Sequence, residues 1–106
     1  MSAKDLPVDE FESAIFAAEL GEAPTLDLHG MDRSIALSEL ETFFHRELMR
    51  HSAAIKIIHG RGNQILRQMV LEWLKKPSQV ALVGKFRDSS NPAEQGAVTY
   101  VALQRL

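Results

Sequence analysis

The chain has 106 residues, which is the size of one domain with at most a short appendage. Apolar residues make up 45% and charged residues 25% of the sequence, a composition that excludes disordered, collagen-like and coiled-coil chains. The absence of cysteine excludes disulfides, iron–sulfur clusters, thiolate zinc sites and cysteine nucleophiles. No apolar run is long enough to span a membrane, and the acidic N-terminus does not have the pattern of a signal peptide. We therefore expect a cytoplasmic protein with no membrane partner.

The net charge of −2 hides an uneven distribution of charge along the chain. Residues 1–24 carry one basic residue and six acidic ones, whereas residues 25–106 carry eleven basic and eight acidic residues. We therefore predict an acidic N-terminal extension (1–24) on a mildly basic domain (25–106). The small positive surplus of that domain permits a polyanionic partner without requiring one.

The N-terminal segment predicts a short amphipathic helix. Residues 7–20 place apolar side chains at nearly helical spacing, and Gly21 and Pro24 then indicate a loop. Two interpretations are open, namely a docking element for a partner and a helix that folds back onto its own domain.

From Thr25 onward the pattern alternates between strand and helix. Thr25–His29 predicts a first strand, with Leu26 and Leu28 on one side and Asp27 and His29 on the other. The remaining elements are, in order, a helix capped by Asp32 and running to about Arg50, a strand at Ile55–His59, a helix opened by Asn63 and stopped by Pro77, and two strands at Val80–Arg87 and Ala97–Leu103.

This order predicts an α/β fold of two layers. Parallel strands joined by helices have right-handed crossovers, which places both connecting helices on one face of the sheet. We therefore predict a two-layer α/β sandwich in the order β-α-β-α-β-β, with a four-stranded mixed sheet whose second face is partly open.

Two histidines stand out because each ends a predicted strand and precedes a glycine. Ligands bind beyond the carboxyl ends of parallel strands, so His29 and His59 are candidate site residues. Asp27 projects to the same side as His29, about 7 Å away along an extended strand, which favours separate contacts to one substrate or a water bridge over a direct hydrogen bond. The alternative is that Asp27 caps a loop and His59 fills a gap in the core. His45 and His51 do not have metal-ligand spacing, and we expect both to be solvated helix residues.

The segment from Gly60 to Asn63 is a candidate anion site. Its two glycines allow a ligand to approach the backbone closely, the following helix N-terminus favours negative charge, and Arg61 adds a positive charge. The segment lacks the Lys-Ser/Thr pair of a mononucleotide P-loop and the third glycine of a dinucleotide-binding loop.

Lys85 and Arg87 alternate on one side of the third predicted strand, opposite Leu82 and Phe86. On an open sheet face they could contact a phosphate backbone, or they could be edge-strand charges that discourage aggregation. Tyr100 could stack on a base, although an isolated aromatic residue in a strand is more often part of the core.

Together these segments resemble the Small MutS-related (Smr) domain family. Residues 26–30 (LDLHG) resemble the family's LDxHG element, and residues 58–62 (IHGRG) resemble its HGxG element. Residues 96–99 (GAVT) resemble its glycine-rich segment before a threonine, so the similarity covers residues 25–106.

The resemblance implies a fold similar to the C-terminal domain of translation initiation factor three, and an endonuclease activity on RNA or DNA tied to ribosome rescue or DNA repair. It assigns Asp27 and His29 as the catalytic pair. Together with the pattern of the residues, it makes the following residues candidates for substrate binding: His59, Gly60, Arg61, Gly62, Asn63, Lys85 and Arg87.

The substrate decides the expected chemistry. On RNA, the 2′-hydroxyl can be the nucleophile and no metal is needed, with His29 as acid or base and His59 as its partner in proton transfer. On DNA, Asp27 would help to bind Mg²⁺ or Mn²⁺ that activates water. The alternative function is a non-catalytic module that binds nucleic acid or the ribosome. The sequence predicts no oligomeric state.

Overall fold

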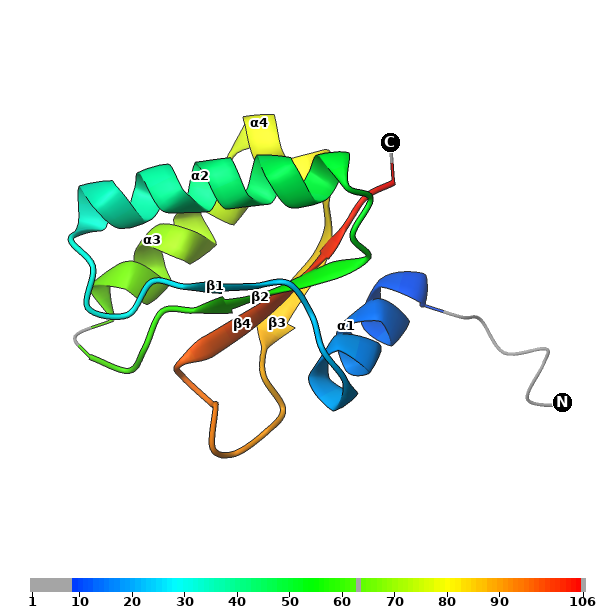
Figure 1. Cartoon of the computed structure of the whole chain (residues 1–106), viewed down its shortest axis with the longest axis horizontal. Coiled ribbons are helices and arrows are strands. Elements are labelled where there is room, and N and C mark those ends of the chain that lie inside the picture. The colour runs from blue at the N-terminus through cyan, green and yellow to red at the C-terminus, as the bar shows by residue number, and fades with distance from the viewer. Residues whose placement is uncertain (1–8, 63, 106) are drawn as a thin grey trace, which may run out of the picture.

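The structure is a computed structural model that describes residues 9–62 and 64–105 (Figure 1). The strand order in the sheet is β1-β2-β4-β3, with β1 parallel to β2 and β4 antiparallel to both of its neighbours. The predicted four-stranded mixed sheet is therefore confirmed. The elements are, in chain order, α1 (Glu10–Leu20), β1 (Thr25–Asp27), α2 (Arg33–Met49), β2 (Ala54–Ile58), α3 (Ile65–Leu74), α4 (Pro77–Val80), β3 (Val83–Asp88) and β4 (Val98–Leu103).

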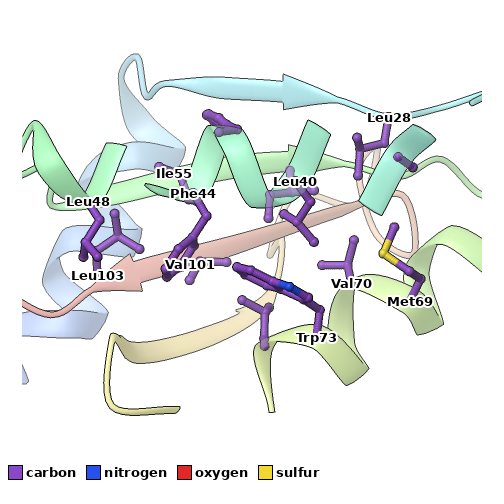
Figure 2. Packing of buried hydrophobic residues seen from close by; sticks show 14 residues of the cluster. Leu28, Leu40, Phe44, Leu48, Ile55, Met69, Val70, Trp73, Val101 and Leu103 are labelled. Atoms are coloured by element: carbon purple, nitrogen blue, oxygen red, sulfur yellow. The ribbon is translucent and has the colours of Figure 1, made fainter. Parts of the chain in front are cut away.

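The main core lies between the sheet and the helices α2 and α3, which both cover the same face (Figure 1). Figure 2 shows Leu40 and Phe44 of α2 and Val70 and Trp73 of α3 in this layer. The rings of Phe44 and Trp73 meet edge to face, with their centroids 5.0 Å apart, a geometry that adds about 0.5–1.5 kcal/mol to the gain from burial. The helical spacing of the apolar residues thus fixes which sides of α2 and α3 face the sheet.

The opposite face of the sheet is covered by α1 (Figure 1). Ile15 of α1 is fully buried in a second apolar cluster with Tyr100 and other residues of β2 and β4. The ring of Phe11 lies directly over Gly84, where an added Cβ would come within 2.3 Å of it, so any larger residue at position 84 would displace the ring. The sequence predicted a partly open face here, but α1 folds back onto it, because its apolar side finds a matching surface on the strands.

The boundaries of some elements differ from those predicted. The cap at Asp32 is confirmed, since its Oδ1 accepts the backbone N–H of Ser34 at 2.9 Å. The helix that Pro77 was predicted to stop ends at Leu74, and Pro77 itself begins the short helix α4, because its fixed φ suits the first turn of a helix. The third strand therefore starts at Val83 instead of Val80. Asn63, predicted to open a helix, lies outside the described residues.

Several smaller predictions also have an outcome in the structure. His45 and His51 are exposed, as expected of solvated residues on and after α2. Tyr100 is 2% exposed, so its ring belongs to the second cluster and is not available for stacking on a base. In the part of the chain that the structure describes, no helix has both the length and the apolar character needed to cross a membrane.

Candidate active site

The two predicted motifs meet because β1 and β2 are parallel neighbours. Asp27 is in register with Ile58, and the backbone N–H of Leu28 donates to the carbonyl of Ile58 at 2.7 Å. Gly60 then passes so close to His29 that a Cβ at position 60 would lie 3.2 Å from the His29 Cβ. Gly60 also has a φ of +79°, a conformation that favours glycine. The two strand ends therefore form one continuous surface.

Asp27 and His29 are joined directly. The Asp27 Oδ1 accepts a hydrogen bond from His29 Nδ1 at 2.5 Å and another from the His29 backbone N–H at 3.1 Å. The sequence analysis disfavoured this direct contact, because it assumed that the strand continues to His29. The strand ends at Asp27, and the chain then turns as it does when an aspartate side chain binds its own backbone two residues ahead. That turn brings the imidazole back to the carboxylate.

The hydrogen bonds set the protonation of this pair. The bond from the His29 side chain is the main cause that lowers the pKa of Asp27 below its ordinary value, so the carboxylate is ionised at neutral pH. Because the Nδ1–H group donates a hydrogen bond to Asp27, the Nε2 atom of a neutral His29 is the hydrogen-bond acceptor. Within the described residues Nε2 has no partner, and the His29 side chain is 69% exposed. The pair thus presents a free basic nitrogen to solvent.

His29 opens onto a pocket of about 680 Å³, a volume in the range of small-molecule sites. The pocket lies beyond the ends of β1 and β2 and between the first turns of α2 and α3. It is lined by both polar and apolar side chains, namely His29, Gly30, Met31, Asp32, Arg33, His59, Arg61, Gly62, Gln64, Ile65 and Leu66. Four of the predicted site residues are thus gathered around one hollow.

His59 is a buried residue at the edge of this pocket. Its Nε2 lies 2.9 Å from the Thr99 hydroxyl, and its Nδ1 lies 3.2 Å from the carbonyl oxygen of Gly60. Burial is the main cause that lowers the pKa of His59, so the ring is neutral, with Nδ1 donating and Nε2 accepting. Since both ring nitrogens are engaged within the fold, His59 holds the glycine turn against β4 and has no nitrogen free for proton transfer.

Arg61 also holds this turn in place. Its guanidinium donates to the carbonyl oxygens of Ala93 at 2.7 Å and Gln95 at 3.1 Å, which ties the turn to the loop between β3 and β4. Arg61 was predicted to add a positive charge for an anion, but these bonds hold its guanidinium within the fold. Gly62 has no heavy atom within 4 Å of the position that a Cβ would occupy, so a ligand can approach the backbone there.

Lys85 and Arg87 lie on the face that α1 covers, and neither lines the pocket. Lys85 Nζ lies 3.2 Å from a carboxylate oxygen of Asp9 and 3.0 Å from one of Glu12. Arg87 binds Glu12 at 2.7 Å and also pairs with Glu19. Their contact with phosphate was predicted for an open sheet face. In the structure, carboxylates of α1 and of its cap Asp9 instead form ion pairs with both basic residues.

Arg33 is a pocket residue that the sequence analysis did not single out. It is exposed and lies in the first turn of α2. A positive charge at that position opposes the helix dipole, and this local conflict is the signal that could have drawn attention to it.

The described residues contain no group of three or more histidine, aspartate or glutamate side chains placed to hold a metal ion. The Asp27 carboxylate contacts His29, and Mg²⁺ can bind through a single carboxylate together with water and substrate phosphates. Such an ion would compete with His29 for the Asp27 oxygen that accepts both hydrogen bonds.

Comparison with known proteins gives consistent matches. The model of the Smr domain family matches residues 26–104, a region that contains both motifs and begins after α1. The "Endonuclease MutS2" of Streptococcus pneumoniae (strain CGSP14) is 27% identical over 99 residues, which cover 92% of this chain and 13% of that protein. The chain thus spans only a small part of this relative.

Two solved structures share the fold. The crystal structure of the Smr domain of Thermus thermophilus MutS2 has a TM-score of 0.69 and 27% identity, covering 76% of this chain and 98% of that one. YdaL, a stand-alone small MutS-related protein from Escherichia coli, has a TM-score of 0.73 and 19% identity, covering 93% of this chain and 79% of that one.

Proposed function

The chain belongs to the Smr domain family, and from this premise we propose that it is an endonuclease that cleaves RNA. Similarity to a protein named Endonuclease MutS2 supports phosphodiester cleavage as the class of reaction. The observation that carries the proposal is the Asp27–His29 pair, which leaves the His29 Nε2 free at an open pocket. An imidazole held in this way is suited to act as a general base.

The proposed step uses the substrate's own hydroxyl as nucleophile. His29 Nε2 removes the proton from a ribose 2′-hydroxyl, and the 2′-oxygen forms a bond to the adjacent phosphorus. The bond from phosphorus to the 5′-oxygen of the next nucleotide breaks, and that oxygen takes a proton from water. The His29 imidazolium then gives its proton to the hydroxide that remains, which restores the neutral ring. The products are a 2′,3′-cyclic phosphate and a 5′-hydroxyl end.

Asp27 acts in this scheme as a positioning residue. Its carboxylate holds His29 with Nδ1 protonated, so Nε2 is the atom that accepts the substrate proton. The same carboxylate stabilises the imidazolium that forms when the proton is transferred.

The turn at Gly60 and Gly62 is the proposed binding site of the scissile phosphate. Gly62 leaves its backbone accessible, and the side chain of Gln64 does not cap the adjacent N-terminus of α3. Helix N-termini favour phosphate groups because their backbone N–H groups and dipole attract anions.

The experiment that tests this proposal is analysis of product ends. Matched RNA and DNA oligonucleotides are incubated with the full chain, with chelator or with added Mg²⁺ or Mn²⁺. A 2′,3′-cyclic phosphate formed from RNA in the presence of chelator supports the proposed step. Cleavage of DNA that depends on the added metal overturns it in favour of water activated by an ion at Asp27.

Variants test the role of the histidine. We expect His29→Ala to lower the cleavage rate by roughly 10²–10⁴-fold, whereas His45→Ala, which changes an exposed histidine of α2 outside the pocket, retains it. If the wild-type chain cleaves neither single-stranded, structured nor ribosome-bound RNA and still binds it, the protein is instead a binding module for nucleic acid or the ribosome.

A further inference from the structure

Arg33 differs from the other arginine of the pocket in that its side chain has no partner among the described residues. Both Arg33 and Arg61 line the hollow that contains His29. The guanidinium of Arg61 is bound by the carbonyl oxygens of Ala93 and Gln95. Arg33 forms no ion pair or hydrogen bond through its side chain with any residue that the structure describes. The pocket therefore presents one arginine that is fixed within the fold and one that is available to a ligand.

The position of Arg33 does not favour the helix that contains it. Residues in the first turn of a helix are best acidic, because the N-terminus carries partial positive charge. The first turn of α2 contains no acidic residue, whereas that of α1 contains Glu10 and Glu12. The Asp32 carboxylate, which precedes Arg33, accepts hydrogen bonds from Ser34. A residue that opposes its local structure without a compensating contact points to a functional role.

We propose that Arg33 binds a backbone phosphate next to the scissile phosphate, an inference that rests on the proposed function. The pocket of about 680 Å³ is large enough for a drug-sized ligand and thus for more than one phosphate group. Met31, Ile65 and Leu66 add apolar surface to its lining, which suits the ribose and base between two phosphates. A guanidinium matches phosphate geometry with two parallel hydrogen bonds. Arg33 thereby fixes the register of the bound nucleic acid, while His29 acts at the adjacent scissile phosphate.

The test compares Arg33→Gln with Arg105→Gln. Arg105 is also exposed, lies outside the pocket of His29 and has no side-chain partner among the described residues, so the control removes the same charge elsewhere. The probe is a fluorescently labelled single-stranded DNA, which has no 2′-hydroxyl and so resists the proposed step. We expect Arg33→Gln to weaken binding about tenfold and to reduce the slope of log affinity against log salt by about 0.7. Arg105→Gln should have a much smaller effect on both.

Cleavage and melting measurements separate binding from a structural role. On RNA, Arg33→Gln should raise KM with little change in kcat, because the contact is made equally in the ground and transition states. The Tm should not fall, because the lost charge opposes the dipole of α2. Arg33→Lys should restore the salt slope but only part of the affinity.

Two results would overturn the inference, and neither depends on catalysis. Equal affinities and salt slopes for the two glutamine variants would show that Arg33 contributes only general charge. A loss of binding accompanied by a lower Tm would assign Arg33 a structural role. If the wild-type chain cleaves nothing, the proposed function fails, but the binding comparison still decides the role of Arg33.

Discussion

The pocket at the ends of β1 and β2 and the face beneath α1 both contain basic side chains, and these side chains differ in their partners. At the pocket, the His29 Nε2 and the Arg33 guanidinium have no partners among the described residues. Beneath α1, Lys85 and Arg87 are paired with carboxylates of the N-terminal segment. The difference indicates that a basic residue is available to a ligand only where the fold leaves its side chain unpaired.

The largest effect that we expect separates these two regions by cleavage. Asp27→Asn should lower the rate on RNA by roughly 10²-fold or more, because the amide no longer holds His29 in the required tautomer or stabilises its charge. The double variant Lys85→Gln, Arg87→Gln should lose far less activity. Rates from single-turnover assays provide the measurement. A comparable loss in both variants would mean that the face beneath α1 also binds substrate.

The next effect concerns the stability that α1 gives to the fold. Ile15 is fully buried between α1 and the sheet, so Ile15→Ala should lower the free energy of unfolding by about 2–5 kcal/mol. Phe16→Ala is the matched control, because Phe16 lies on the same helix and is 57% exposed. Urea denaturation gives both values. If the two variants have equal stability, α1 does not form part of the cooperative fold.

A smaller effect is expected at the glycine turn of the second motif. Gly60→Ala places a Cβ 3.2 Å from that of His29, at a backbone φ of +79°. We expect a loss of about 1–3 kcal/mol in stability from the strained backbone and a lower cleavage rate from the displacement of His29. Gly30→Ala has a similar φ of +78° but no atom within 4 Å of the added Cβ. It should share the strain and retain more of the activity, whereas equal activities would show that contact with His29 does not matter.

The smallest expected effect is the pH dependence that comes from His59. Burial lowers its pKa in the folded state below the ordinary value of 6.5. As the pH falls below about 6.5, the unfolded chain takes up a proton that the folded chain does not, so stability decreases until the lowered pKa is reached. Urea denaturation between about pH 7.5 and pH 5 should show this decrease. His59→Gln should flatten it, because the other histidines are common to both proteins; an unchanged slope would contradict the buried neutral ring.

The sequence predicted the sheet and its two covering helices because those elements follow from local pattern. The stripe that includes Leu40 and Phe44 has helical spacing, and a strand–helix–strand order leaves few possible topologies. The coverage by α1 was open to two interpretations, since it depends on the fit of Phe11 over Gly84. Such a fit between segments far apart in the sequence has no local pattern.

The candidate site was predictable to a similar degree. The proximity of His29 to Gly60 follows from parallel pairing, which a sequence can indicate. The bond between Asp27 and His29 was not predicted, because it arises from the turn that follows the strand. The fixed position of Arg61 likewise depends on carbonyl groups of the loop between β3 and β4. Contacts to backbone carbonyl groups cannot be predicted from residue types, because every residue has such a group.

The acidic residues of α1 also have a consequence at long range. Asp9, Glu12 and Glu19 pair with the basic residues of β3 on that flank. A polyanion diffusing toward the protein would thus be attracted to that flank less strongly than the basic residues of β3 alone predict. By pairing with the basic residues of β3, α1 and its cap would in this way influence the side from which a negatively charged ligand approaches.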